Sequence, residues 1–417
     1  MKHRIIEICK NILIVLLVGS LLLLTIAAIP TQSIRSVTWL SRLLQPFAPL
    51  MGWNEAELTY VAEAYPVTDA ARPIAISIMN DAGRYTAMWD FDRLDAELET
   101  FSSYLGQAMD NAKSFHEVSD SQIQAALRTH SVYFAYGAPQ QTAVLASWYD
   151  SSLSSAIGSV DGCILAVEEN TLSLYLLGET SYAASTSISA DSLLSILADY
   201  EPDGSSFAFE TQYALHPLRL ISGKRHTVPA VTLSTDLDAN SLDALATALG
   251  FNPYGEGRYT DDAGTVSFSE DGTSLEVTAD GSITYFAQTA RFSADSTRPE
   301  ILAQTAQQFV DTVFDGVTGE GRLYLSRLTQ SGSQTVCHFD YYISGVQLVM
   351  SQAPVVITFT DHAITQAQVQ RYSFISTSKT LYPLPIAQAA ALLPEGSKLE
   401  LTYYIDASGT LSAGWKR

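Results

Sequence analysis

A serine and a lysine three residues apart form the spacing in this chain that is closest to an active-site motif. Enzymes that recognise penicillin carry Ser-x-x-Lys at the start of a helix, together with Ser-Asp-Asn and Lys-Thr-Gly elsewhere. Here Ser376-Thr377-Ser378-Lys379 follows a stretch typical of a strand and leads into Tyr382-Pro383. Lys379-Thr380 is followed by Leu381 rather than by glycine. We therefore interpret the spacing as a coincidence and predict no nucleophilic serine there.

Other residues that could catalyse a reaction or bind a metal ion are scattered along the sequence. The sequence has no His-Glu-x-x-His, no Gly-x-Ser-x-Gly and no phosphate-loop pattern. The acidic pairs Asp261-Asp262 and Glu270-Asp271 fall in expected turns, where solvated carboxylates are usual. Six histidines lack metal-ligand spacing: His116, His130, His216, His226, His338 and His362. We predict a protein that is not an enzyme, with no catalytic, cofactor-binding or metal-binding residues.

The three cysteines do not form a disulfide framework. Cys9 precedes an uncharged segment described below, so only Cys163 and Cys337 could pair with each other. A disulfide requires a specific geometry that sequence cannot test, and the pairing stays open. The folded parts must therefore be held mainly by their apolar cores.

Composition predicts a folded, acidic protein. Hydrophobic residues make up 47% of the 417 residues, charged residues only 16%, and the formal net charge is −21. This length suggests two or three folded units. The negative charge excludes a nucleic-acid-binding role and disfavours docking onto anionic lipid or an anionic wall polymer.

The most distinct segment is a run without charged residues over 11–34. As a helix it would extend roughly 36 Å at 1.5 Å per residue, which exceeds a hydrocarbon core of about 30 Å. A backbone in lipid must satisfy its own hydrogen bonds, so the run predicts one transmembrane helix. The alternative is a cleaved signal peptide, but the run is long and Ala27-Ala28-Ile29-Pro30 is a poor cleavage site.

Flanking charge predicts the orientation of this helix. Lys2, Arg4 and Lys10 precede it, against one acid, Glu7. The positive-inside rule therefore places residues 1–10 in the cytoplasm and the remainder outside the cell, in a single-pass protein of the cell membrane. Residues 35–57 are interpreted as a juxtamembrane segment, in which Trp39 suits the membrane interface.

One face of the predicted helix could contact a partner helix. Small residues allow close backbone approach in lipid. The hypothetical contact face consists of Leu16, Gly19, Ser20, Leu23 and Ala27. The alternative is that every face of the helix meets lipid.

Residues 58–232 are expected to form an N-terminal extracytoplasmic α+β domain, or two subdomains. Alternating apolar residues predict a hairpin with strands over 73–78 and 84–89. Apolar residues at spacings of four, three and four predict a helix over 94–108. The other predicted elements are a capped helix from Ser119, strands over 132–136, 162–167, 172–176 and 207–210, a short helix from Ala190, and a boundary over 217–229.

Residues 233–298 are expected to form a central domain, and residues 299–417 a C-terminal one. Asp271-Gly272 and Asp280-Gly281 stand between alternating runs, which is a strong hairpin signal. The central elements are a helix over 242–249 and a meander over 265–269, 274–278 and 282–287. The C-terminal elements are a helix over 299–314, strands over 322–328, 335–343, 354–359 and 364–374, a helix over 386–393 and a strand over 398–405. The fold class is therefore α+β, with antiparallel sheets and packed helices after one transmembrane helix.

These stretches resemble the YycH/YycI family, accessory membrane proteins of an essential cell-wall two-component system in Gram-positive bacteria. In the N-terminal half the YycH-like stretches are 91–112, 132–136 and 207–210, followed by His216-Pro217. In the C-terminal half, the part shared with YycI, the similar stretches are 249–252, the meander, 339–346 and the end of the chain with Trp415.

The resemblance implies a function and a partner. Family members contact a sensor histidine kinase through transmembrane helices and outer domains, and so tune its autophosphorylation. The expected partners are that kinase and a second YycH/YycI-type protein, and the expected domains are PepSY-like helix-plus-sheet modules. The resemblance implies no catalytic residue. The alternatives are an extracytoplasmic module that binds a wall fragment, peptide or lipid, and an exported hydrolase.

Overall fold

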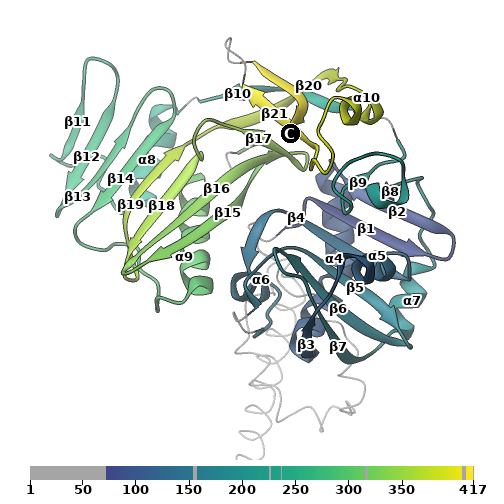
Figure 1. The fold of residues 1–417 in the computed structure, drawn as a ribbon. Helices are drawn as coiled ribbons and strands as arrows, with labels where there is room; N and C mark the ends of the chain where they lie inside the picture. Colours follow the sequence, from purple (N-terminus) through teal and green to yellow (C-terminus); the bar gives the residue numbers. More distant parts are fainter. Residues whose placement is uncertain are drawn as a thin grey trace, which may run out of the picture. The chain divides into compact units, whose positions relative to one another are not determined.

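A computed structural model describes residues 72–153, 157–224, 227–235, 237–314, 318–405 and 410–416. All of them belong to one compact unit, Val67–Arg417 (Figure 1). No helix among these described residues is long and apolar enough to cross a membrane. The helix predicted over 11–34, its contact face and the juxtamembrane segment lie outside the described residues.

The first sheet is antiparallel and contains seven strands in the order β2-β1-β4-β5-β6-β7-β3. Its strands are β1 (Ala75–Asn80), β2 (Gly83–Met88), β3 (Lys113–Glu117), β4 (Ser131–Gln141), β5 (Ser159–Glu168), β6 (Thr171–Gly178) and β7 (Tyr182–Ser189). The β1–β2 hairpin closes because the Asn80 side chain accepts hydrogen bonds from the backbone N–H groups of Ala82 and Gly83. Local turn chemistry therefore sets the register of this hairpin.

Helix α4 (Phe91–Asn111) covers one face of the first sheet. It begins where the Asp90 carboxylate accepts a hydrogen bond from the backbone of Arg93, a helix cap. Its apolar residues Leu94, Leu98 and Phe101 are buried, as the predicted stripe requires. The other helices of this half are α5 (Asp120–Ala126), α6 (Thr142–Trp148) and α7 (Asp191–Leu197).

The second sheet contains eleven strands. Its main order is β11-β12-β13-β14-β19-β18-β16-β17-β21-β22, and β15 pairs with β16. All the pairings are antiparallel except the one between β17 and β21. The strands are β11 (Arg258–Thr260), β12 (Val266–Glu270), β13 (Thr273–Val277), β14 (Ser282–Ala287), β15 (Gly321–Ser331), β16 (Gln334–Ile343), β17 (Val346–Val349), β18 (Val355–Thr360), β19 (Ala363–Gln370), β21 (Glu400–Ile405) and β22 (Leu411–Lys416).

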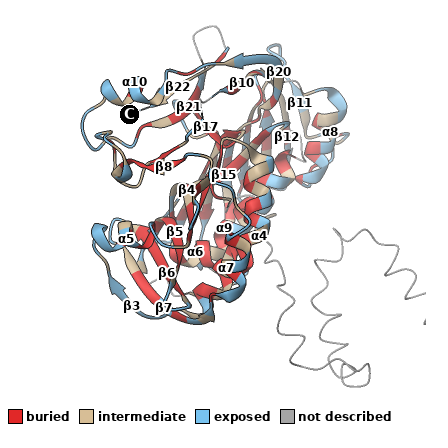
Figure 2. Ribbon diagram, turned by 90° about the vertical axis from the view of Figure 1, so that its right-hand side faces the viewer, coloured by how far each residue is buried: buried red, intermediate tan, exposed pale blue. Residues whose placement is uncertain are grey.

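Helices α8 (Ala239–Ala248) and α9 (Pro299–Phe314) pack against the second sheet, and α10 (Ile386–Ala391) precedes β21. An aromatic cluster fixes α9, because Phe309 contacts Tyr285 and Phe292 with ring centroids 5.5 and 5.1 Å apart. Buried residues follow the strands of both sheets and the helix faces turned toward them (Figure 2). Apolar burial is therefore the main stabilising term for both halves.

Four short elements connect the two halves. These are β8 (Ser206–Phe207), the 3₁₀ helix η5 (Ala208–Glu210), β9 (Leu220–Ile221) and β10 (Val228–Ser234). β8 pairs with β9, and β10 pairs with β20 (Ser373–Leu381). The expected domain boundary between residues 232 and 233 therefore falls within β10, which is hydrogen-bonded to β20 of the C-terminal part.

The predicted α+β class with antiparallel sheets is confirmed, and so are the first hairpin, the Asp-Gly meander and the helices over 94–108 and 299–314. Strands from 233–298 and from 299–417 form one sheet, because β14 hydrogen-bonds to β19. The expected boundary at 298 therefore falls within a single sheet rather than between two.

Three local predictions are corrected. The strand expected over 207–210 is mostly a 3₁₀ turn, because the Glu210 carboxylate accepts the Phe207 N–H and closes it. The strand expected over 364–374 breaks after Gln370, where the chain leaves β14 and turns to pair with β10. The boundary expected over 217–229 contains β9 and the start of β10.

Candidate functional site

The serine–lysine pair singled out in the sequence lies on a strand. Ser376 and Lys379 both belong to β20, and Lys379 is exposed. The Ser376 hydroxyl donates a hydrogen bond to the carboxylate of Glu320. A helix start, which the penicillin-recognising arrangement needs, is not found at these residues.

The two cysteines of the described region are buried and free, so Cys163 and Cys337 do not pair. They lie on β5 of the first sheet and β16 of the second. Burial raises the pKa of Cys337 to about 12 and also raises that of Cys163, with a smaller contribution from Asp161. Both thiols therefore act as small apolar core groups rather than nucleophiles.

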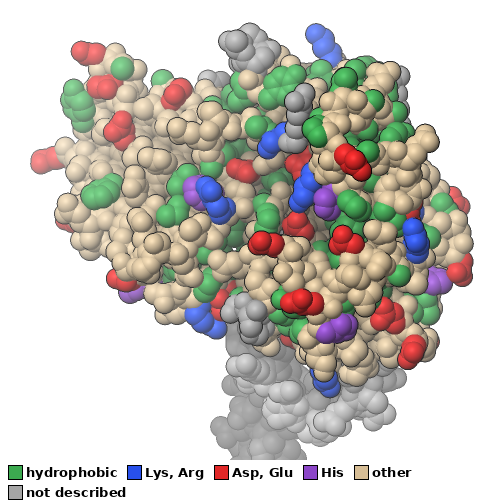
Figure 3. Space-filling model, in the orientation of Figure 1, with side chains coloured by type: hydrophobic (Ala, Val, Ile, Leu, Met, Phe, Trp, Pro, Cys, Tyr) green, Lys and Arg blue, Asp and Glu red, His purple; other side chains and the backbone are tan. Residues whose placement is uncertain are grey.

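A cavity of about 120 Å³ brings charged and apolar side chains together, and we call it the Arg219 pocket. Its apolar wall comes from the first sheet, the residue that follows β2, and β9: Ala75, Met88, Trp89, Tyr133, Leu177 and Leu220. Its polar rim consists of Asp161, His216, Arg219, Lys398 and Glu400. Basic, acidic and histidine side chains lie near one another on the face shown in Figure 3. The rim joins residues from both halves of the unit.

The Arg219 guanidinium has no ion pair or hydrogen bond with any residue that the structure describes, and its Nε is buried without a partner. Lys398, in contrast, has an ion-pair partner, because its Nζ lies 3.3 Å from Asp161 Oδ2. Burial lowers the pKa of Arg219, and the negative charge of Glu400 opposes this effect. The pocket therefore holds a desolvated cation without a contacting counter-ion.

The segment that carries Arg219 is tied to β8 and η5 by backbone hydrogen bonds. Phe207 pairs with Leu220 across β8 and β9. The Ala208 N–H donates to the Arg219 carbonyl at 2.9 Å. The position of Arg219 thus depends on where η5 is held.

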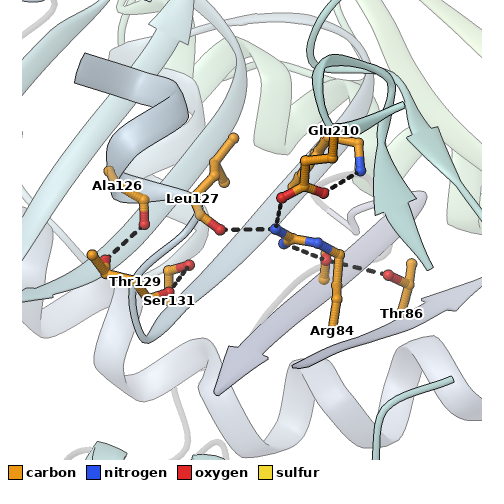
Figure 4. Close-up of polar contacts among 9 residues, drawn as sticks. Arg84, Thr86, Ala126, Leu127, Thr129, Ser131 and Glu210 are labelled. Carbon is orange, nitrogen blue, oxygen red and sulfur yellow. Dashed lines mark hydrogen bonds and ion pairs between the residues drawn. The ribbon is translucent and has the colours of Figure 1, made fainter. Parts of the chain in front are cut away.

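An ion pair between the buried Arg84 and the partly exposed Glu210 holds η5. Arg84 of β2 donates to Glu210 Oε1 at 3.0 Å and to the Leu127 carbonyl at 2.8 Å, while Glu210 Oε2 accepts the Phe207 N–H at 2.7 Å (Figure 4). The Arg84 guanidinium also lies 4.4 Å from the centroid of the Phe207 ring. Burial lowers the pKa of Arg84, opposed by Glu210. This network fixes the segment beneath the pocket.

The other side of the pocket is fixed by the second half of the chain. The His216 N–H donates to the Ser397 carbonyl at 2.9 Å, and Leu215 forms a parallel bridge with Ser397. Lys398 and Glu400 follow directly. Burial lowers the pKa of His216, and the positive charge of Lys398 adds to this effect, which favours a neutral imidazole.

A larger hollow of about 500 Å³ lies beside α5, β6 and β7. Its carboxylate, Glu168, accepts hydrogen bonds from Ser173 Oγ at 2.7 Å and Tyr175 Oη at 2.5 Å. His116 also lines this hollow. Both Glu168 oxygens are already used by neighbouring residues, so the Arg219 pocket offers the stronger binding group.

Strand pairing also brings Ser326, His338 and Asp340 together around a β-bulge in β15. Burial raises the pKa of Asp340, while hydrogen bonds from Ser326 and Gln347 oppose this effect. The Ser326 hydroxyl donates to the His338 carbonyl at 3.2 Å, and His338 Nδ1 is buried without a partner. In a catalytic triad the carboxylate would bind that nitrogen and the other would face the serine. The geometry observed is not that of a triad.

The two sheets are joined by a clamp centred on Asp95 of α4. Its carboxylate accepts two hydrogen bonds from Arg322 of β15, at 2.8 and 2.7 Å, and also contacts Arg72. The Arg322 guanidinium lies 4.0 Å from the centroid of the Phe91 ring. Nearby, Gln140 Nε2 donates to the Leu325 carbonyl at 2.6 Å. We call Arg72, Asp95 and Arg322 the clamp.

Sequence reasoning missed both the clamp and the pocket. It gave His216 no catalytic or metal-binding role and did not single out Arg219, Asp95 or Arg322. One weak signal exists, because Arg219 stands between Leu218 and Leu220, an unusual place for a fully charged side chain. The other residues of the clamp and the pocket are far apart in the sequence, so no local pattern indicated that they meet.

Comparisons with known proteins do not identify a family. No family model and no curated protein matches the chain. A search of solved structures gave the DNA polymerase III beta subunit of Thermotoga maritima, with 10% identity, 85% of this chain and 95% of that chain covered, and a TM-score of 0.12. A similarity at that score supports no statement about fold or function.

Proposed function

We propose that this protein is a membrane-anchored regulator of a two-component sensor histidine kinase in cell-wall homeostasis, and that it acts by binding. The observation that carries the proposal is the uncharged run over 11–34, which precedes the large α+β unit Val67–Arg417 in the sequence. A single helix of that length suffices to hold the unit at a bilayer. Residues 1–10 then lie in the cytoplasm and the α+β unit lies outside the cell.

The partner contacts in this proposal have two parts. In the membrane, the face with Gly19 and Ser20 packs on a kinase helix and biases its two signalling states. Outside the membrane, the PepSY-like modules contact the outer part of the kinase or a second YycH/YycI-type protein. Exposed apolar side chains on and near β20 and α10 offer contact area: Ile375, Tyr382, Leu384 and Leu392.

The clamp supports transmission between these parts. Arg72 is the described residue nearest to the anchor in sequence, and it contacts Asp95, which also binds Arg322 of the second sheet. A contact made by either sheet can thus be communicated to the start of the folded unit through charged groups held in fixed positions. Ion-paired side chains in fixed positions are one physical route by which two sites can be coupled.

Crosslinking in native membranes tests the proposal. A photo-reactive residue at Leu16 or Leu23 is expected to capture a histidine kinase. The same probe at Val18 serves as the matched control, because at 100° per residue Val18 lies on the opposite face of the helix. Capture of no kinase from either face, with normal expression, would contradict the proposal.

A second experiment measures the rate of kinase autophosphorylation. Gly19→Leu blocks close approach of the two backbones and is expected to change kinase autophosphorylation, whereas Val18→Leu is expected to leave it unchanged. Unchanged output for Gly19→Leu at normal membrane levels would exclude this face as the contact.

A second candidate function, an extracytoplasmic module that binds a small ligand, is favoured by one observation: the unpaired guanidinium in the Arg219 pocket. The two functions are compatible, since a ligand-binding unit can also be a regulator. An exported hydrolase has less support, because Ser326, His338 and Asp340 do not have the required geometry.

A further inference from the structure

We propose that the Arg219 pocket is a binding site for a monoanionic organic carboxylate with a short apolar substituent, such as the C-terminal apolar residue of a peptide. The inference goes beyond the proposed contact with a kinase and does not depend on it. It rests on the cavity, the unpaired guanidinium and the composition of the wall.

The first step concerns the unpaired charge. A buried or partly buried guanidinium without a counter-ion is unfavourable, and folded proteins normally pair such groups. Arg219 Nε is buried without a hydrogen-bond partner, and no carboxylate of the described residues forms an ion pair with this side chain. A ligand carboxylate would supply the missing acceptor, and the planar guanidinium fork matches it with two parallel hydrogen bonds.

The second step concerns the ligand's charge. The rim carries two fixed cations, Arg219 and Lys398, and two carboxylates, Asp161 and Glu400. Lys398 is already occupied by Asp161 at 3.3 Å. The four rim charges sum to zero, so a monoanion bound to Arg219 leaves one net negative charge, whereas a dianion such as phosphate would leave two beside Asp161 and Glu400. The balance favours a monoanion.

The third step concerns the apolar part. Met88, Trp89 and Leu177 line the cavity beside the rim. A volume of about 120 Å³ accommodates a carboxylate with a small aliphatic group, but not a drug-sized molecule. Each buried methylene is expected to tighten binding by about fourfold.

A carboxylate of the protein itself, that of Glu400, competes with the ligand for the Arg219 guanidinium. Glu400 lines the same cavity and influences the pKa of Arg219 without an ion pair between them. A rotation of either side chain would let Arg219 and Glu400 form an ion pair, and that pair would exclude the ligand carboxylate. Removing its charge by Glu400→Gln should then tighten ligand binding several-fold and not weaken it.

The test uses the full chain in detergent micelles and saturation-transfer NMR. The probes are N-acetyl-L-leucine, its uncharged analogue N-acetyl-L-leucinamide, and inorganic phosphate. The carboxylate is expected to bind at least tenfold more tightly than the amide or phosphate, since charged hydrogen bonds of this kind change affinity by roughly ten- to a hundredfold. Equal binding of carboxylate and amide, or no binding of the carboxylate, would overturn the proposal.

Variants locate the binding to this pocket. Arg219→Gln is expected to weaken binding of the carboxylate at least tenfold. Arg298→Gln, at an exposed arginine outside the pocket, is the matched control and should leave binding unchanged. Equal affinity in Arg219→Gln and the unaltered chain would place the ligand elsewhere and refute the site.

The comparison of carboxylate with amide is made on the unaltered chain, so it decides the question even if a variant fails to fold. The readout does not involve a kinase. Failure of this proposal therefore leaves the proposed regulatory function standing, and failure of the crosslinking experiment leaves the binding site standing.

Discussion

Asp95 and Arg322, 227 positions apart in the sequence, form two parallel hydrogen bonds with N–O distances of 2.8 and 2.7 Å. Asp95 lies on the helix that covers the first sheet, and Arg322 lies on a strand of the second. The pair therefore adds a charged contact between the two sheets, whose buried apolar residues belong to one continuous core cluster. Paired hydrogen bonds of this geometry are the stronger class of ion pair.

Replacing Asp95 by Asn should lower the free energy of unfolding by about 1–2 kcal/mol, because Arg322 and Arg72 lose their charged acceptor. Urea unfolding followed by circular dichroism measures the change. Asp92→Asn, at an exposed acid one turn away on the same helix, is the control and should cost a few tenths of a kcal/mol at most. Equal losses in the two variants would mean that the clamp contributes nothing specific.

The contribution of Asp95 should also depend on pH. Burial alone would raise the pKa of Asp95, but hydrogen bonds from Arg322 and the charges of Arg72 and Arg322 outweigh it and lower the pKa. A lowered pKa gives stability that is present above the pKa of an unfolded aspartate and is lost as pH falls through the folded pKa. The stability difference between the unaltered chain and Asp95→Asn should therefore shrink below about pH 4. A difference that stays constant between pH 7 and pH 3 would contradict this assignment.

The Arg84–Glu210 pair should be strongly coupled. Arg84→Ala removes the buried guanidinium with its hydrogen bonds to Glu210 and the Leu127 carbonyl and its packing on Phe207, with an expected loss of about 2–3 kcal/mol. Glu210→Gln should cost less, because Arg84 keeps its bond to the Leu127 carbonyl. A double-mutant cycle from thermal unfolding should give a coupling of about 0.5–3 kcal/mol. Strict additivity would show that the two side chains act independently.

Gly137 marks a close approach of the two halves. A Cβ atom added there would lie 2.0 Å from the Tyr342 hydroxyl oxygen and 2.6 Å from its ring carbon Cζ. Gly137→Ala should therefore destabilise the protein by about 1–3 kcal/mol through overpacking. In a Tyr342→Ala background the same change should have almost no effect.

The control for this prediction is Gly255→Ala, where the nearest atom would lie at 3.4 Å, an ordinary contact distance. Thermal unfolding of the four variants provides the comparison. A loss for Gly137→Ala that persists after Tyr342 is removed would trace the effect to the β4 backbone and not to this contact.

Asp340 should be a site where removing charge stabilises the protein. Burial raises its pKa, so the folded state disfavours the carboxylate at neutral pH. A raised pKa means that stability is gained as pH falls and is lost above the pKa of the unfolded residue. Asp340→Asn keeps an acceptor for Gln347 Nε2 and should raise the free energy of unfolding at pH 7 by about 0.5–1 kcal/mol.

The advantage of Asp340→Asn should shrink as pH falls toward the pKa of an unfolded aspartate, because the raised pKa favours protonation of the native carboxyl there. Glu276→Gln, at an exposed acid on β13, is the control. Lower stability of Asp340→Asn at pH 7 would show that the charge itself is used, for example by His338 on the same strand.

Local patterns in the sequence determined most of the secondary structure. The stripe of Leu94, Leu98 and Phe101 predicted α4, and Asp271-Gly272 predicted a hairpin, because helix periodicity and tight-turn conformations depend on residues close in sequence. The prediction of a helix over 11–34 rests on the same kind of local information, its length without charge. The strand expected over 207–210 was wrong, because the Glu210 side chain closes a 3₁₀ turn there that the pattern of apolar residues does not indicate.

Tertiary structure alone decided the clamp and the pocket. Asp95 meets Arg322, and Arg219 shares a cavity with Lys398 and Glu400, only because strands far apart in sequence pair within the folded unit. The charge of each of these residues was visible in the sequence, but the presence or absence of a partner was not. Desolvation and ion pairing depend on what surrounds a side chain in space, and no local pattern specifies that environment.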